Sequence, residues 1–372
     1  MNDKRTFFSV LAGMLCILGL LLLAIVLNDQ APVLEDTANS LSIATTNRIV
    51  RPGVYRLTGE LIDKPLVIDT VRDKVKLILD NVTIKNSNGP AIICRSTDSL
   101  TIKLVGENIL QDGGEYSSDY ADIKGAIHSE TDLTFDGDGS LSITTKHDAI
   151  HGNESIHILS GNFNISASDD AIHAKNSLLI DGGIIKIAKS YEGLESANIT
   201  INNGSLSVVS SDDGINVNST GAVNINGGDI HIDASGDGID SNGHININGG
   251  TIFVDGPTKD NDGALDSEFG IIVKGGTVFA LGASGMAEAP ADVSSQYSVS
   301  VFFESTLPAG SKVEIKNTNQ ETISQYVALK TFSHATISTA GFKSGESYIL
   351  YIDDTEYTRF DILSTTTIIK ML

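Results

Sequence analysis

The chain has 372 residues, a formal net charge of -22, and 36 glycines but no tryptophan. This acidic balance, without any basic stripe, argues against nucleic acid as a partner and favours metal ions or partners that tolerate an acidic surface. A chain of this length can bury a sizeable core, and the scarcity of aromatic residues indicates an elongated core of aliphatic side chains.

The first predicted element is an uncharged run, residues 7–27, that follows Lys4 and Arg5. At about 1.5 Å per residue, this run can cross the roughly 30 Å apolar core of a bilayer. The preceding charges predict a cytoplasmic N-terminus and an exported remainder. We therefore expect residues 1–28 to anchor a single-pass cell-membrane protein with an extracellular domain, and the alternative is a cleaved signal that yields a secreted protein. Residues 29–42 are polar and patternless, and they are expected to form a linker.

Residues 43–285 are predicted to form stacked coils, of which the first are less regular. Residues 53–57 and 75–84 are strand-like and are interpreted as terminal coils that hide the open end of the stack. Residues 106–124, rich in Gly, Ser, Asp and Tyr, interrupt the pattern, so we expect a loop that leaves the coils.

From residue 125 to residue 266 a block of about twenty-two residues recurs, and its copies share an acidic residue, then Ala or Gly, then Ile or Leu. Inside each block, apolar and polar residues alternate, and Gly, Asn or Asp separates three short strands. Three strands per block describe a parallel β-helix, an all-β fold in which equivalent residues stack in columns about 4.8 Å apart. The inward column is predicted to comprise Ile127, Ile150, Ile172, Leu194, Ile215, Ile239 and Leu265. A ladder of amides along the axis is predicted at Asn202, Asn226 and Asn248.

Residues 286–372 have lost the repeat and contain several strand-like segments separated by ordinary turns. The expected structure is a small antiparallel β cap that covers the C-terminal end of the stack.

The predicted chemistry lies in the acidic turns, which stack from block to block. Acidic residues are also ordinary turn formers, but carboxylates stacked about 4.8 Å apart repel each other unless a cation lies between them. Calcium suits this spacing because it binds about six to eight oxygen ligands at about 2.4 Å. We therefore predict Ca2+ as a cofactor. Its candidate ligands are Asp169, Asp170, Glu192, Glu195, Asp212, Asp213, Asp237, Asp240, Asp262 and Asp266.

Three histidines form a separate predicted column, His128, His151 and His173. Stacked imidazoles alone lack a fourth ligand for zinc, and an outward ladder of imidazoles is equally consistent with the pattern. The sequence therefore gives little support to a zinc site at these positions.

Several segments together carry a family resemblance: residues 53–57 (Gly-Val-Tyr-Arg-Leu), residues 79–84 (Leu-Asp-Asn-Val-Thr-Ile), residues 126–135, and the Asp-Gly-Ile turns at 213–215 and 237–239. Over roughly residues 43–355 the chain resembles the extracellular carbohydrate-binding, calcium-binding β-helix proteins of bacteria. The resemblance implies a right-handed parallel β-helix similar in fold to pectate lyases. It also implies calcium bound on the coils and an association with cellulose and with acidic sugars such as polygalacturonate. The chain departs from the family pattern where His follows Ala-Ile, at the three histidines of the predicted column.

Charge then decides between the glycans that the resemblance implies. An acidic surface repels a polyuronate, so bound calcium ions with open coordination positions must supply the attraction to sugar carboxylates or hydroxyls. Neutral glucans stack on aromatic rings, but the repeats contain little beyond Phe163, Tyr191, Phe253 and Phe279. The sequence thus predicts a carbohydrate-binding protein that uses calcium to bind polysaccharide, with acidic sugars favoured over cellulose.

Two alternatives stay open. A calcium-dependent polysaccharide lyase would need a base beside the metal, and Lys175 and Lys189 are the candidates. Both are more simply interpreted as solvated surface lysines, which favours binding over catalysis. A structural surface protein or adhesin would use calcium only for rigidity, without any glycan.

Overall fold

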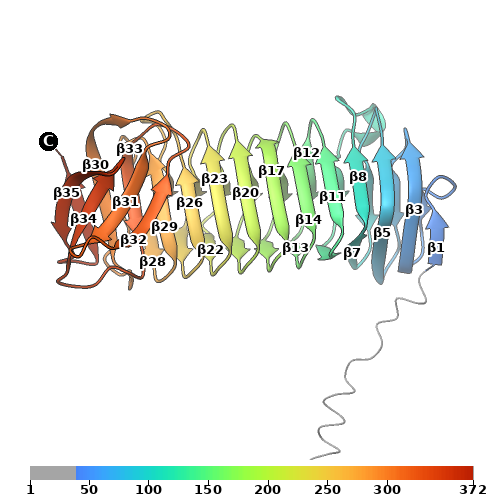
Figure 1. The fold of residues 1–372 in the computed structure, drawn as a ribbon. Coiled ribbons are helices and arrows are strands. Elements are labelled where there is room, and N and C mark those ends of the chain that lie inside the picture. The colour runs from blue at the N-terminus through green and yellow to red at the C-terminus, as the bar shows by residue number, and fades with distance from the viewer. Residues whose placement is uncertain (1–38, 372) are drawn as a thin grey trace, which may run out of the picture. The chain divides into compact units, whose positions relative to one another are not determined.

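The computed structural model describes residues 39–371 (Figure 1). The predicted membrane segment, residues 1–28, lies outside the described residues. Between residues 39 and 371 the helical structure is limited to the 3-10 helix η2 (Ser118–Tyr120), and no helix there has the length and hydropathy of a membrane span. The end of the predicted linker forms strand β1 (Asn39–Ser42), which pairs with β3 (Gly53–Ile62). The fold is all-β, as predicted.

The coils consist of three stacks of parallel strands (Figure 1). The later coils contribute one strand to each stack, whereas each of the first two contributes one strand to stack 1 and one long strand, β3 or β5 (Lys74–Lys85), that runs along the other two stacks. Stack 1 follows the acidic turn of each block and contains β2 (Arg48–Ile49), β4 (Leu66–Asp69), β6 (Ile92–Ser96), β9 (Gly125–Ser129), β12 (Asp148–Gly152), β15 (Ile172–Ala174), β18 (Leu194–Ser196), β21 (Ile215–Val217), β24 (Ile239–Ser241) and β27 (Leu265–Ser267). Its ten strands correspond to ten coils, so the prediction of a parallel β-helix is confirmed.

From β7 onward, the other two strands of each coil alternate along the chain. Stack 2 contains β7 (Ser99–Val105), β10 (Leu133–Gly137), β13 (Ile156–Ile158), β16 (Leu178–Ile180), β19 (Ile199–Ile201), β22 (Ala222–Ile225), β25 (His244–Ile247) and β28 (Ile271–Val273). Stack 3 contains β8 (Glu107–Gln111), β11 (Ser140–Thr144), β14 (Asn162–Ser166), β17 (Ile184–Ser190), β20 (Ser205–Ser210), β23 (Asp229–Ala234), β26 (Thr251–Asp255) and β29 (Thr277–Gly282). The long strand β5 (Lys74–Lys85) pairs with both β7 and β8, so it joins stacks 2 and 3 into one sheet.

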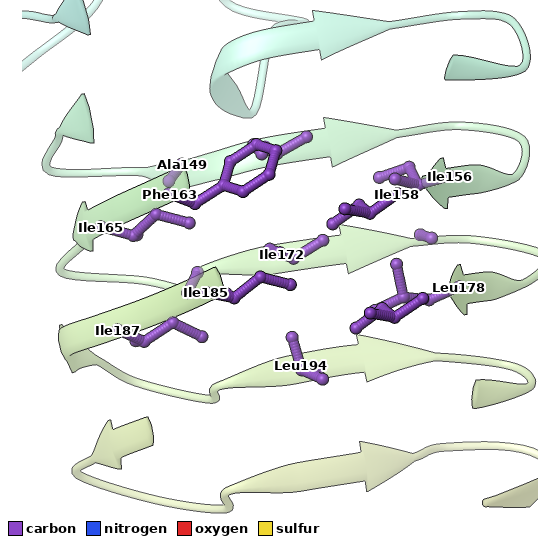
Figure 2. Close-up of a cluster of buried hydrophobic side chains, with 14 of the residues drawn as sticks. Ala149, Ile156, Ile158, Phe163, Ile165, Ile172, Leu178, Ile185, Ile187 and Leu194 are labelled. Carbon is purple, nitrogen blue, oxygen red and sulfur yellow. The ribbon is translucent and has the colours of Figure 1, made fainter. Parts of the chain in front are cut away.

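The core is a set of aliphatic columns inside the coils (Figure 2). Side chains alternate across a strand, so every second residue points inward, and the parallel register places like residues above one another. In stack 1, Ile150 pairs with Ile127 and Ile172, and Ile172 pairs with Leu194. All members of the predicted inward column are buried, which confirms that column.

The loop predicted for residues 106–124 is wrong in its first part, because β8 pairs with β11 and β5. The strand was missed because Asn108, a polar residue, occupies one of its inward positions, where it is 1% exposed. Its Oδ1 accepts the N–H of Val82 at 2.9 Å, and its Nδ2 donates to the carbonyl oxygens of Val105 and Ser140 at 3.1 Å. A buried amide that satisfies its hydrogen bonds in this way replaces the expected apolar residue.

The predicted amide ladder is present at the turn after stack 2. Asn226 Nδ2 donates to Asn202 Oδ1 at 2.7 Å, and Asn248 Nδ2 donates to Asn226 Oδ1 at 2.8 Å. The ladder ties three successive coils together outside the core.

Replacing Asn226 with Ala should therefore break two ladder bonds and lower the free energy of unfolding by about 1–2 kcal/mol. Asn248→Ala breaks one of these bonds, so its effect is expected to be about half as large. Urea unfolding followed by circular dichroism measures both variants, and equal losses in the two would contradict the ladder as a source of stability.

The C-terminal cap begins at the last coil. Strand β33 (Phe332–Ser338) pairs antiparallel with β29 and with β30 (Ser298–Leu307), and β30 pairs parallel with β36 (Thr366–Lys370). A second, antiparallel sheet contains β32 (Thr322–Val327), β31 (Lys312–Asn317), β34 (Ser347–Ile352) and β35 (Thr355–Asp361). These strands enclose a second apolar core that includes Phe279 of the last coil. The cap thus covers the exposed edge that the solenoid would otherwise present, and the predicted antiparallel sheet is confirmed.

Candidate functional site

The acidic turns lie just before stack 1, and their carboxylates connect neighbouring coils. In each case a side-chain oxygen of one turn accepts a backbone N–H of the turn on the next coil. The four bonds are Asp170 N to Asp148 Oδ1 (3.2 Å), Glu192 N to Asp170 Oδ1 (3.2 Å), Asp237 N to Asp213 Oδ1 (2.7 Å) and Gly263 N to Asp237 Oδ1. The predicted stacking of acidic turns is therefore present. One oxygen of each of these carboxylates accepts a backbone N–H group in the turn, outside the hydrogen-bonded strands.

The three histidines stack on the outward side of stack 1. His151 pairs in register with His128 and His173, and the ring centroids are 5.2 Å and 4.6 Å apart, with the planes nearly parallel. The side chains of His128 and His151 are nevertheless almost completely buried. His128 Nε2 lies 2.9 Å from Glu130 Oε1, so the histidine column is an internal polar network rather than a solvated ladder.

Carboxylates surround the two later histidines. Asp148 Oδ2 lies 2.7 Å from His151 Nδ1, and Glu195 Oε2 lies 2.5 Å from His173 Nδ1, with Asp170 Oδ2 at 3.5 Å from the same nitrogen. Within residues 39–371, three groups of side chains bring possible metal ligands within 4.8 Å of one another. The groups are Asp148 with His151 and His173, Asp170 with His173 and Glu195, and Asp148 with Asp169 and Asp170. Because they share members, they form one centre, which we call the histidine–carboxylate centre.

The electrostatics of this centre are those of buried, closely spaced charges. Burial raises the pKa of Asp170 to about 7 and that of Glu192 to about 8. Burial alone would lower the pKa of His173, but its contacts with Asp170 and Glu195 outweigh that effect and raise it to about 10. The same contact with His173 lowers the pKa of Glu195 to about 2. The imidazolium of His173 thus compensates part of the negative charge.

Further along the stack the histidines give way to carboxylates. Asn216 pairs with Asp240, and Asp240 pairs with Asp266, so two carboxylates occupy the line that the imidazoles occupy on earlier coils. Burial raises the pKa of Asp213 and of Asp237 to about 7, and neighbouring carboxylates contribute to both shifts. We call this second group, Asp212, Asp213, Asp237, Asp240, Asp262 and Asp266, the carboxylate strip.

A glycine opens space within the carboxylate strip. The N–H of Gly236 donates to the carbonyl of Asp212 at 3.0 Å, so the two residues occupy equivalent places on adjacent coils. A Cβ atom at Gly236 would lie 2.5 Å from Asp213 Oδ1 and 2.6 Å from Asp212 Oδ1. Two carboxylate oxygens therefore converge on a space that a side chain at this position would fill.

The ten predicted ligands thus divide between two places. Asp169, Asp170 and Glu195 belong to the histidine–carboxylate centre, whereas six others form the carboxylate strip. Glu192 lies between them, where its Oε1 accepts a hydrogen bond from Asn216 Nδ2 at 3.0 Å. The predicted ligand set omits Asp148, which touches His151 across the turn. The sequence did contain a signal for Asp148, because it stands three residues before a histidine.

The structure also places the other residues that the sequence singled out. Phe163 and Phe279 are buried in the cores and cannot meet a ligand, and Phe253 stacks on Tyr326 with ring centroids 4.3 Å apart. Tyr191 is 47% exposed, and its backbone bonds to Asp169 and Asp212 place it beside the acidic turns.

The two candidate bases of the lyase alternative are both exposed. Lys175 lies in the turn after β15, and Lys189 in β17 donates from its Nζ to Ser168 Oγ at 3.3 Å.

No curated protein matches the chain, but a solved structure and a family model do. A solved structure, that of the polysaccharide lyase-like protein from C. thermocellum in a gadolinium derivative, is similar with 25% sequence identity and a TM-score of 0.46, and the match covers 64% of this chain and 88% of that chain. The model of the family described as carbohydrate-binding domain-containing protein matches residues 44–216 and 197–354, which together span most of the chain. The chain therefore belongs to the family of carbohydrate-binding domain-containing proteins.

Proposed function

We propose that this protein binds an acidic polysaccharide of the polygalacturonate kind through calcium ions held by the carboxylate strip. The observation that carries the proposal is the convergence of Asp212 Oδ1 and Asp213 Oδ1 on the space left by Gly236. Calcium needs several oxygen ligands at about 2.3–2.6 Å. Asp212 and Asp213 would supply two of them from one coil, and Asp237 and Asp240 on the next coil are the candidates for the others. Membership of a carbohydrate-binding family supports the glycan part of the proposal.

Charge supports an acidic rather than a neutral glycan. Without metal, half-buried carboxylates such as Asp213, Asp237 and Asp240 would repel a uronate. A calcium ion that keeps open coordination positions turns the same surface into a binding site for sugar carboxylates. The exposed ring of Tyr191 lies beside the acidic turns and offers an apolar face to a sugar ring. Export and membrane anchoring through residues 7–27 are part of the proposal and would bring this surface to extracellular polysaccharide.

The test is migration of the purified protein through native gels that contain polygalacturonate or a soluble cellulose derivative, with calcium and with chelator. We expect retardation only by polygalacturonate with calcium. Asp213→Asn should abolish most of it, and the matched control Asp229→Asn, whose side chain is 61% exposed on stack 3, should not. Unchanged migration under all conditions would overturn the proposal and favour structural calcium, whereas release of unsaturated uronides would favour a lyase.

Replacing Gly236 with Ala should weaken calcium binding at least about tenfold, because the added methyl group occupies the space between the Asp212 and Asp213 carboxylates. Calcium titration followed by calorimetry measures the change. A Cβ at Gly114 meets no atom within 4 Å, so Gly114→Ala is the matched control and should bind calcium like the parent protein. Equal calcium affinity in both variants would place the ion elsewhere.

A further inference from the structure

The histidine–carboxylate centre differs chemically from the carboxylate strip. It combines two imidazole nitrogens, from His151 and His173, with the carboxylates of Asp148, Asp170 and Glu195 on three adjacent coils, β12, β15 and β18. Calcium prefers oxygen ligands, whereas imidazole suits divalent transition metals such as zinc. The carboxylates also supply the further ligands that a column of histidines lacks by itself.

We propose that the histidine–carboxylate centre binds one divalent transition-metal ion of the zinc class, with His173 as the ligand common to two of the groups and with its further ligands drawn from His151, Asp148, Asp170 and Glu195. This site is separate from calcium and glycan binding at the carboxylate strip.

The spacing of the ligand atoms is close to that of a zinc site. Zinc binds nitrogen at about 2.0–2.1 Å and carboxylate oxygen at about 2.0–2.2 Å, so ligands of one tetrahedral ion lie about 3.4 Å apart. The nitrogen–oxygen distances here are 2.7 Å for His151 and Asp148, 3.5 Å for His173 and Asp170, and 2.5 Å for His173 and Glu195. Within each group the possible ligand atoms lie within 4.8 Å of one another, so a metal ion would replace the shared protons after side-chain adjustment.

The surroundings of the centre hold it in place and leave one buried carboxyl oxygen without a partner. Asp148 and Asp170 are fixed by backbone N–H groups of neighbouring coils, and His151 Nε2 lies 3.2 Å from Asn153 Oδ1. A metal-bound histidine commonly makes such an outer contact through its second nitrogen. Glu192 Oε2, on the coil that donates to Asp170, is buried and has no hydrogen-bond partner among the described residues. A nearby cation would favour the ionised form of this carboxyl group.

A surface pair elsewhere in the chain provides the contrast. His157 Nε2 lies 2.6 Å from Asp181 Oδ2, but both side chains are about one-third exposed and neither belongs to the three groups of possible metal ligands. This pair has the same two chemical groups without the further ligands. His157 is therefore the matched control position.

The test is titration of the purified protein with Zn2+, followed by calorimetry, and with Co2+, followed by its visible absorption. We expect one zinc ion per chain at micromolar or tighter affinity, and a cobalt spectrum typical of a site with nitrogen ligands. His173→Gln and Glu195→Gln should each weaken zinc binding at least about tenfold, whereas His157→Gln should leave it unchanged. Circular dichroism confirms that each variant is folded.

Three outcomes would overturn the proposal. They are the absence of zinc binding to the parent protein, equal losses in His157→Gln and His173→Gln, and displacement of zinc by an equal concentration of calcium. Because the assay contains no glycan, failure of polysaccharide binding in gels does not affect its result.

Discussion

Calcium, at about a hundred times its Kd, is expected to raise the thermal unfolding temperature of this protein by about 5 °C at pH 8 and to have little effect at pH 5. Binding to the folded state alone stabilises it by about 2.7 kcal/mol at that concentration. The dependence on pH arises because calcium binds ionised carboxylates, and burial raises the pKa of Asp213 and Asp237 to about 7. At pH 5 protons therefore occupy the carboxyl groups of Asp213 and Asp237.

Without calcium, stability should change with pH in the opposite sense to that of ordinary surface carboxylates. Between about pH 4, where unfolded Asp titrates, and about pH 7, the folded chain binds more protons than the unfolded chain. The free energy of unfolding therefore falls as the pH rises through this window. Asp240, whose pKa burial raises to about 6, contributes in the same direction.

Scanning calorimetry at pH 5, 6, 7 and 8, with and without calcium, measures both effects. The double variant Asp213→Asn, Asp237→Asn should lose the share of the pH slope that these two carboxyl groups supply and most of the calcium effect, and Asp229→Asn should retain both. Magnesium is the metal control, because it requires near-octahedral geometry and releases its water reluctantly. An equal calcium shift at pH 5 and pH 8, or an equal shift with magnesium, would contradict a calcium site in the strip.

The sequence predicted those parts of the structure that follow from repetition. An alternation of period two, repeated about every twenty-two residues, determines which side chains face inward and which stack from coil to coil. The inward column around Ile172 and the ladder around Asn226 followed from this pattern alone. The strand at residues 107–111 did not, because its inward residue Asn108 is polar and only its hydrogen bonds to three backbone segments make it acceptable inside.

The candidate site was predicted as a line but not as a set of contacts. Repetition placed the acidic residues and the histidines in neighbouring columns, and the register confirms that placement. Which atoms meet depends on rotamers and on the bend of each turn. Asp148 turns back to His151 on its own coil, whereas Glu195 reaches His173 on the preceding coil. Spacing in the sequence does not distinguish these two directions, so the division between a histidine centre and a carboxylate strip required the structure.

Replacing Ile172 with Ala is expected to lower the free energy of unfolding by about 3–4 kcal/mol, among the largest effects of a single apolar substitution in the coils. Ile172 is fully buried between Ile150 and Leu194, so the removed atoms leave a cavity that the hydrogen-bonded rungs on either side cannot close. The matched control is Ile184→Ala, because Ile184 lies on β17 with its side chain directed outward and is 56% exposed.

Urea unfolding of both variants measures the difference, and Ile184→Ala should change the free energy of unfolding by less than about 0.5 kcal/mol. The shape of the transition is also informative, because each coil contacts only its neighbours. A single shifted transition would mean that the ten coils unfold together, and a separate early transition in Ile172→Ala would mean that the coils around β15 unfold on their own. Similar losses in the two variants would contradict the inward column as the main source of stability, since the two residues share chemistry and differ only in burial.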